Sequence, residues 1–277
     1  MSQTDTCMSF LWAKKKEQNG QFFWLPLTLH LKDTMGVMDF LWHHWVSEGQ
    51  KEIIIHALSD TGEEVADTAQ RLACFLAGIH DLGKCTPVFQ TQKGYQNSPD
   101  LDIALLNRLE QVGLTGISSL NLDMAARKRS HHTVTGEYLL QYFGVQQDIA
   151  SVIGAHHGKP VDKEEIVTKM KRYPRYCFQD ETKGPCQRLW LAMQKKLLEG
   201  SLENFPISVF PARAGVIPDV HDTASFVISK IDTIIGSDIG IDIGFTQVIV
   251  YILQEVTYTY IRANCWYWPR RRHLIRV

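Results

Sequence analysis

The chain has 277 residues, of which 44% are hydrophobic and 21% are charged, a composition typical of a soluble globular protein with a substantial core. Its formal net charge is −1, so global charge gives no argument for a nucleic-acid partner, which would need a local basic patch. The six cysteines form no C-x-x-C pair, which excludes a zinc ribbon and a redox dithiol. The sequence has no signal-peptide pattern and no uncharged apolar run of membrane-spanning length, so we expect a reduced, cytoplasmic protein with no membrane partner.

Apolar residues at helical spacing predict an all-α domain over the first 205 residues, built by packing helix on helix. Strand-like alternation is nearly absent before residue 200, so we expect almost no sheet there. The predicted helices are Leu25–Val46, Val65–Ile79, Thr133–Phe143, Gln147–Ala155, Val161–Met170 and Cys186–Glu199.

The last part of the chain differs, and we expect residues 206–277 to form an irregular, atypical tail outside the domain of residues 1–205. Three prolines interrupt residues 206–220, and residues 231–244 are a biased run of isoleucine, glycine and aspartate. Residues 246–261 are rich in β-branched and aromatic side chains and score as strand.

Histidines recur in short motifs in the order H…HD…H…HH. The motifs are His30 in LHLKD, His80-Asp81 in GIHDLGK, His131-His132 before TVTG, and His156-His157 in GAHHG. Neutral imidazole and carboxylate are ligands for manganese, nickel, cobalt, iron and magnesium. The two oxygens of one carboxylate can bridge two ions, and two metals about 3.5–4 Å apart can activate water for attack on a phosphodiester.

A single histidine on a mostly apolar helix is more often a packed or surface residue than a ligand, and we interpret His43, His44 and His56 in that way. A His-Asp dipeptide alone is equally uninformative. The four motifs in this order, flanked by glycines, are a far stronger signal than any one of them and indicate a metal site.

With their flanks, these motifs resemble the HD superfamily, and in detail the HD nuclease domain of the CRISPR-associated nuclease-helicase of type I systems. The resemblance covers about residues 9–200 and implies an HD-domain helical bundle that cuts single-stranded DNA in antiviral defence. The matching segments are Trp12-Ala13-Lys14-Lys15, His30-Leu31-Lys32-Asp33-Thr34, His80-Asp81-Leu82-Gly83-Lys84, Thr86-Pro87-x-Phe89-Gln90, His132-x-x-x-Gly136 and His156-His157-Gly158.

Carried over residue by residue, the resemblance implies two metal sites joined by Asp81. The ligands of the first would be His30, His80 and Asp81, and those of the second would be Asp81, His132, His156 and His157. His132 is preferred over His131 because the family places its histidine four residues before a glycine. The family's last ligand is an aspartate in a motif like Asp-Trp-Ile-Ala/Gly-Ser, for which Asp232 is the nearest candidate, without the tryptophan and one residue out of step.

We expect catalytic roles for Asp81 and Lys84. Lys84 would stabilise negative charge at the scissile phosphate, and its alternative role is that of a solvated lysine at a helix end. Candidate DNA contacts are Arg127, Lys128, Arg129, Lys171 and Arg172, with Lys14, Lys15 and Lys16 as further cations and Tyr173 and Tyr176 as stacking partners; a solvated loop is the alternative for most of them.

The sequence has no P-loop G-x-x-x-x-G-K-[ST], so we expect the nuclease to act without a helicase of its own. Its expected partners are single-stranded DNA, a separate helicase and the CRISPR surveillance complex. Residues 209–218 look like a translated CRISPR repeat, and the hypothesis that follows is that the tail is read from array DNA, leaving a truncated, inactive remnant. A further alternative is an HD phosphohydrolase acting on nucleotides, although the Thr86–Gln90 segment favours the nuclease.

Overall fold

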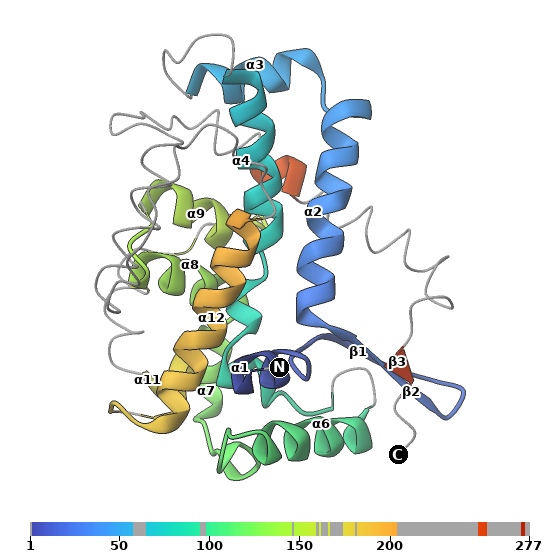
Figure 1. The fold of residues 1–277 in the computed structure, drawn as a ribbon, viewed down its shortest axis with the longest axis vertical. Helices are drawn as coiled ribbons and strands as arrows, with labels where there is room; N and C mark the ends of the chain where they lie inside the picture. Colours follow the sequence, from blue (N-terminus) through green and yellow to red (C-terminus); the bar gives the residue numbers. More distant parts are fainter. Residues whose placement is uncertain are drawn as a thin grey trace.

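A computed structural model shows a helical protein with one small sheet (Figure 1). It describes residues 2–57, 65–94, 98–145, 147–158, 161, 166, 174–180, 182–203, 249–253 and 273–274. The helices are α1 (Gln3–Met8), α2 (Leu27–His44), α3 (Glu48–Ala57), α4 (Val65–Ile79), α5 (Pro87–Gln90), α6 (Pro99–Gln111), α7 (Met124–Arg129), α8 (His132–Tyr142), α9 (Gln147–Ala155), α11 (Pro174–Phe178) and α12 (Pro185–Glu203). The predicted all-α bundle is therefore confirmed.

Helix α4 is the centre of the bundle, with α2 along one side and α12 along another (Figure 1). Gly78 lies where these three helices meet, because a Cβ atom there would be 2.5 Å from the Met35 side chain of α2 and 3.3 Å from the Ser201 hydroxyl of α12. The buried face of α4 includes Leu76 and Ile79, which belong to one continuous core. This close approach brings the C-terminal end of α4 against the N-terminal half of α2.

A β-hairpin precedes α2, so the expectation of almost no sheet before residue 200 is wrong in this segment. Strand β1 (Trp12–Gln18) pairs antiparallel with β2 (Gln21–Pro26), which also pairs with β3 (His273–Leu274). The two-residue turn is Asn19-Gly20, with φ of 53° and 72°. Asn-Gly turns with both φ angles positive match the twist of paired strands and fix their register.

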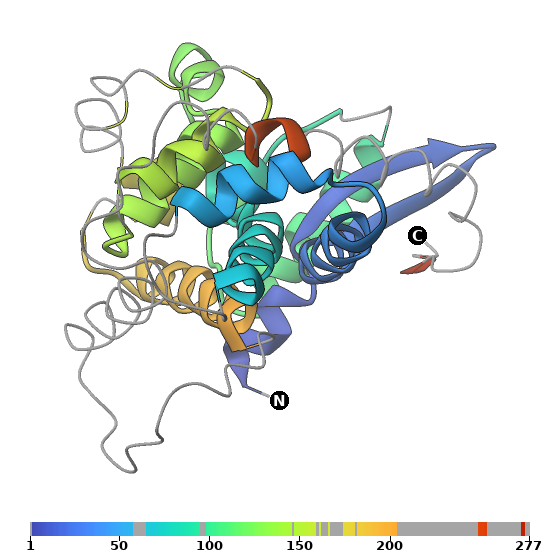
Figure 2. The same cartoon turned by 90° about the horizontal axis from the view of Figure 1, so that it is seen from above.

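The hairpin also changes where α2 begins. The helix starts at Leu27, after Pro26, and Leu25 belongs to β2 and not to the helix predicted from residue 25. In Figure 2 the hairpin projects to one side of the helices, with its base against the start of α2. The N-terminal turn of α2, which carries His30, is thus held between the sheet and α4.

A buried ion pair joins the hairpin to α6. Lys15, only 1% exposed, pairs with Asp102 of α6 and donates a hydrogen bond to the Gln92 carbonyl at 3.0 Å. Its ammonium also lies 3.8 Å from the centroid of the Trp12 ring. Lys15 is therefore a structural residue, and its assignment as a DNA contact is wrong because its charge is not at the surface.

Gln90 connects the base of the hairpin to the loop after α4. The backbone N–H of Trp12 donates to Gln90 Oε1 at 3.1 Å, and Gln90 Nε2 donates to the carbonyls of Trp12 and Lys84, both at 2.9 Å. The Trp12 ring packs on Phe89 with centroids 4.3 Å apart. Two segments that lie far apart in the sequence and carry the family resemblance are thus joined directly.

Residues 249–253 are helical, which differs from the strand expected for residues 246–261. Ile249, Ile252 and Leu253 are buried in the main core, and Tyr251 stacks on Trp45 with centroids 6.0 Å apart. Apolar packing against the bundle here outweighs the β-propensity of the segment. Residues 206–220 and 231–244, and most of the helix predicted at Val161–Met170, lie outside the described residues.

Within the ranges that the structure describes, no helix has the length and apolar character needed to cross a membrane.

We predict that the Lys15–Asp102 pair behaves as a buried unit. Lys15→Met or Asp102→Leu alone should lower the free energy of unfolding by about 3–5 kcal/mol, because each leaves one buried charge without its partner. The double variant should recover most of the loss, since an apolar pair replaces both charges. Urea denaturation measures all three.

The control for this cycle is Glu48→Gln, which breaks the Lys51–Glu48 pair at 2.7 Å, where Glu48 is 82% exposed. It should cost less than about 1 kcal/mol because water screens the charges. Single variants at Lys15 or Asp102 that cost no more than this control would contradict the buried-pair interpretation.

Candidate metal centre

Four separate segments bring the predicted ligands together. His30 comes from the first turns of α2, and His80-Asp81 come directly after α4, at the start of the 3₁₀ turn Leu82–Lys84. His132 is the first residue of α8, and His156-His157 follow the end of α9. Two groups of ligand atoms are close enough to hold an ion: His30, His80 and Asp81 in one, and His132, His156 and His157 in the other.

The Asp81 carboxylate lies between the two groups. Its Oδ2 is 2.6 Å from His30 Nε2 and 3.0 Å from His80 Nε2. Its Oδ1 is 3.3 Å from His132 Nε2 and 3.8 Å from His156 Nε2. One carboxylate with one oxygen toward each group is the arrangement that a bridging ligand requires.

The hydrogen bonds of the rings set which nitrogen faces the centre. His80 Nδ1 donates to the Ala77 carbonyl at 2.8 Å, and His156 Nδ1 donates to the Ile153 carbonyl at 2.6 Å. Because a carbonyl oxygen can only accept, each ring carries its proton on Nδ1 and presents the Nε2 lone pair inward. A backbone acceptor on the outer nitrogen is the usual support of a metal-binding histidine.

Several buried polar atoms of the centre lack a hydrogen-bond partner among the described residues: His80 Nε2, His156 Nε2 and Asp81 Oδ1. Each such atom costs about 1–3 kcal/mol if nothing satisfies it. The Nε2 atoms of His132 and His157 are 3.0 Å apart, which is close enough for both ring nitrogens to bind the same ion. A divalent cation would satisfy all of these atoms, so the residues fit the metals that the motif implies.

The electrostatics favour the protonation states that metal ligands need. Burial lowers the pKa values of His30 and His156 to about 3, and it holds the pKa of His132 well below its usual range. Burial opposes ionisation of Asp81, but the proximity of His80 and Lys84 and the hydrogen bond from His30 keep its pKa well below the usual value. Neutral imidazole and ionised carboxylate are the forms that bind a divalent ion.

Lys84 is part of this centre and is not a solvated lysine at a helix end, so that alternative is wrong. Its side chain is 9% exposed, and Nζ lies 2.6 Å from Asp81 Oδ2. The ammonium also lies 5.4 Å from the centroid of the Phe89 ring. Because Gln90 Nε2 donates to the carbonyls of both Trp12 and Lys84, the hairpin base and the lysine backbone are linked through one side-chain amide.

Gly83 lets the turn that carries Asp81 approach the start of α8. A Cβ atom at Gly83 would be 1.9 Å from the His132 carbonyl oxygen and 2.6 Å from the Gly136 nitrogen. Thr135 Oγ1 donates to the Gly83 carbonyl at 3.1 Å, which joins the same two backbones. This close approach sets how near His132 lies to the Asp81 carboxylate.

The basic residues predicted to bind DNA are only partly described. Arg127 is half-buried and donates to the Val88 carbonyl at 2.9 Å and to Thr91 Oγ1 at 3.0 Å, so it also has a structural role. Lys128 and Arg129 are exposed. Lys171, Arg172 and Tyr173, and the candidate ligand Asp232, lie outside the described residues, and their assignments stay predictions.

Tyr176 is 5% exposed, so its assignment as a stacking partner for bases is wrong. His131, in contrast, has a position that sequence reasoning does not find. Its ring lies 4.0 Å from the His132 ring and 5.7 Å from the His157 ring, at the open side of the second ligand group. The His131-His132 dipeptide is the available signal, but its spacing to Gly136 selects only His132.

Five imidazoles surround one carboxylate at the junction of α2, α4, α8 and α9, a histidine–aspartate cluster of the HD type that could hold divalent metal. The family described as "Cas3, HD domain" matches residues 12–229, and the chain belongs to this family. The match runs beyond residue 205, and the domain boundary placed there stays a prediction.

The CRISPR-associated nuclease/helicase Cas3 of Streptococcus thermophilus is 48% identical over 194 residues, which cover 70% of this chain and 21% of that protein. The chain therefore spans about a fifth of the length of this curated relative. A crystal structure of a CRISPR-associated protein matches with a TM-score of 0.54 at 18% identity, over 93% of this chain and 27% of that one. The Cas3 HD domain of Thermus thermophilus in the presence of Ni²⁺ matches with a TM-score of 0.43 at 21% identity, over 93% and 91% of the two chains. The likeness to the first structure concerns the fold alone.

Gly83→Ala should destabilise the protein by about 1–3 kcal/mol, because the added methyl group overlaps backbone atoms of α8. Gly36→Ala is the matched control, since a Cβ atom at Gly36 of α2 meets nothing within 4 Å. That control should be neutral or more stable by up to about 1 kcal/mol from helix propensity. Urea unfolding of both variants gives the comparison, and equal stability of the two would contradict the close approach at Gly83.

Acid should destabilise the metal-free protein in a defined pH window. Because burial lowers the pKa of His156 from an ordinary value of 6.5 to about 3 in the folded state, the unfolded chain takes up its proton first as pH falls. The contribution of His156 to the free energy of unfolding is therefore complete above about pH 6.5. It declines toward pH 3 by about 1.4 kcal/mol per pH unit.

His156→Gln should flatten this decline by about that amount per unit in urea titrations between about pH 6 and 4 with EDTA. His44→Gln, at an exposed histidine of α2, is the control and should keep the wild-type profile. An unchanged profile in His156→Gln would show that His156 does not stay neutral in the fold.

Proposed function

We propose that this chain is a metal-dependent nuclease that cleaves single-stranded DNA in CRISPR interference, at two divalent ions held on either side of Asp81. The observation that carries the proposal is the Asp81 carboxylate, with one oxygen near His30 and His80 and the other near His132 and His156. Membership of the Cas3 HD domain family and the 48% identity to a nuclease/helicase support it.

His30, His80 and Asp81 would hold one ion, and Asp81, His132, His156 and His157 would hold the other. Bound divalent ions supply Lewis acidity toward a phosphodiester and make water a better nucleophile at neutral pH. The identity of the metal is left to experiment among manganese, nickel, cobalt, iron and magnesium.

The protein's own residues complete this chemistry. Hydrolysis joins a water oxygen to phosphorus, breaks one P–O ester bond and delivers a proton to the leaving oxygen, so negative charge grows on the phosphoryl group. Lys84, with Nζ 2.6 Å from Asp81 Oδ2, would place a fixed positive charge beside that group. The backbone acceptors on His80 and His156 keep both rings oriented with Nε2 inward throughout.

The chain would work with partners in the cytoplasm. A helicase and the CRISPR surveillance complex would deliver a single strand to the metal centre; the name of the relative from Streptococcus thermophilus pairs a nuclease with a helicase. Lys128 and Arg129, which are exposed on α7 just before His132, are the described cations best placed to meet that strand.

We predict that the purified chain cleaves circular single-stranded DNA with Mn²⁺, Ni²⁺ or Mg²⁺, and that Asp81→Asn slows cleavage at least about a hundredfold. Circular DNA requires an internal cut, so exonuclease contaminants give no signal. Asp39→Asn is the control, because Asp39 is a 58% exposed carboxylate that also lies near a histidine, at 3.9 Å from His43. It should cleave like wild type.

Deoxynucleoside triphosphates and a cyclic dinucleotide form the second arm of the assay. Turnover of either without any DNA cutting would replace the nuclease proposal with a nucleotide phosphohydrolase. A folded, metal-binding chain that acts on none of these substrates would be the inactive remnant.

A further inference from the structure

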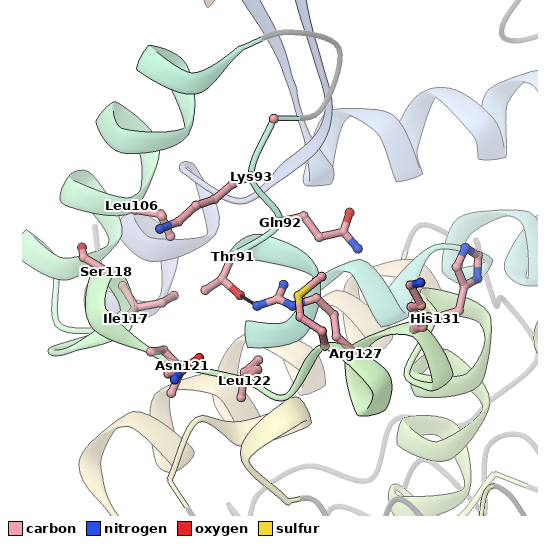
Figure 3. A pocket seen from close by; sticks show the side chains of 14 residues that line it. Thr91, Gln92, Lys93, Leu106, Ile117, Ser118, Asn121, Leu122, Arg127 and His131 are labelled. Carbon is pink, nitrogen blue, oxygen red and sulfur yellow. Dashed lines mark hydrogen bonds between the residues drawn. The ribbon is translucent and has the colours of Figure 1, made fainter.

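A cavity of about 660 Å³ lies next to the second ligand group (Figure 3). Its walls come from residues 91–94 after α5, from α6, from the loop that follows α6, and from α7. His131 closes one end, and its ring is 4.0 Å from the ring of His132. The cavity and the metal centre therefore share a wall, and a ligand in the cavity would lie beside whatever reacts at the centre.

The lining of this cavity combines cationic and apolar side chains. Lys93, Arg127 and Lys128 supply three positive charges, and no acidic side chain is among the lining residues in the part of the chain that the structure describes. The whole chain has a net charge of −1, so this is a local concentration of positive charge. Lys93 and Lys128 are exposed, which leaves their charges accessible from solvent.

The apolar residues of the lining suit a flat, partly apolar group. Leu120, which is half-buried, and Met124, which is 66% exposed, offer an apolar surface to the cavity, and Gln92 and Asn121 add amides to the same lining. Ligand cavities of about 300–1,000 Å³ typically combine apolar walls with a few placed polar groups. A ligand that joins an anionic group to a flat group with hydrogen-bonding edges would match this lining, and a nucleotide is a ligand of this kind.

We infer that this cavity binds the nucleotide next to the phosphodiester that is cut, with the phosphate near Lys93 and Lys128 and the base on the apolar surface. The inference rests on the proposed nuclease function and assigns a binding site to it. Arg127 shapes the site rather than binding the strand, because its guanidinium is held by Val88 and Thr91. A free mononucleotide shares this chemistry, so the test separates it from a strand.

The inference is tested by measuring how tightly a charge-reversed variant binds single-stranded DNA. Lys93→Glu with Lys128→Glu removes two exposed cations of the cavity, and neither residue is within the ligand groups. Fluorescence anisotropy with a labelled oligodeoxythymidylate in EDTA measures binding without cleavage. We expect the dissociation constant to rise at least about tenfold, and the slope of log K against log salt to fall by about 0.7 for each phosphate that the variant no longer neutralises.

The control is Lys183→Glu with Arg188→Glu, which makes the same charge change at two exposed residues that do not line the cavity. It should bind within about twofold of wild type, because the cations of the cavity are unchanged and salt screens exposed charges elsewhere on the surface. Thermal unfolding of both double variants checks that they fold as wild type does.

Equal strand binding by the two double variants would overturn the inference. Displacement of the strand by dTMP at the same nucleotide concentration would also overturn it, because the ligand would then be a mononucleotide. If Lys93→Glu/Lys128→Glu alone weakens binding, the cavity is a strand site even where wild type cuts no circular DNA. In that case only the proposed nuclease function fails.

Discussion

The buried charge of Asp81 is the constraint on which the rest of the structure depends. A buried carboxylate costs several kcal/mol unless charges and hydrogen bonds compensate it. His30 at 2.6 Å and Lys84 at 2.6 Å satisfy one oxygen, which also faces His80 at 3.0 Å, and the second oxygen faces His132 and His156. The bundle therefore folds around a polar group that a divalent cation would compensate further.

The elements outside the centre serve to hold this geometry. Gly78 lets α2 and α12 approach α4, and Gly83 lets the following turn touch α8, so ligands from separate helices come within a few ångströms. Gln90 joins Trp12 of the hairpin to the carbonyl of Lys84, and the buried Lys15–Asp102 pair ties the same hairpin to α6. A rigid support of this kind is what a metal centre needs, because ligand orientation controls metal affinity.

The sequence predicts most of the helices and the ligand motifs, because apolar periodicity and short His/Asp motifs are local signals. It does not predict the Asn19-Gly20 hairpin, although the turn is also a local signal, since the strands around it lack clean alternation. The burial of Lys15 escapes prediction for a different reason. Its partner Asp102 is 87 residues away, and only the tertiary fold shows that a run of three lysines contains one buried cation.

The position of Lys84 depends in the same way on the fold. Sequence alone allows a catalytic or a solvated lysine, and the turn after α4 decides between these environments by placing Nζ beside Asp81. Residues 249–253 show the opposite case, in which packing against the core overrides local strand propensity. The role of His131 depends on the cavity that it lines, and no local sequence pattern predicts that cavity.

The most direct test of the two-metal centre is anomalous diffraction from crystals of the full chain soaked in Mn²⁺. We predict two manganese peaks, one beside His30 and His80 and one among His132, His156 and His157, with the Asp81 carboxylate as a ligand of both. A single peak away from Asp81, or ions bound only at exposed carboxylates such as Asp39, would contradict a centre bridged by Asp81.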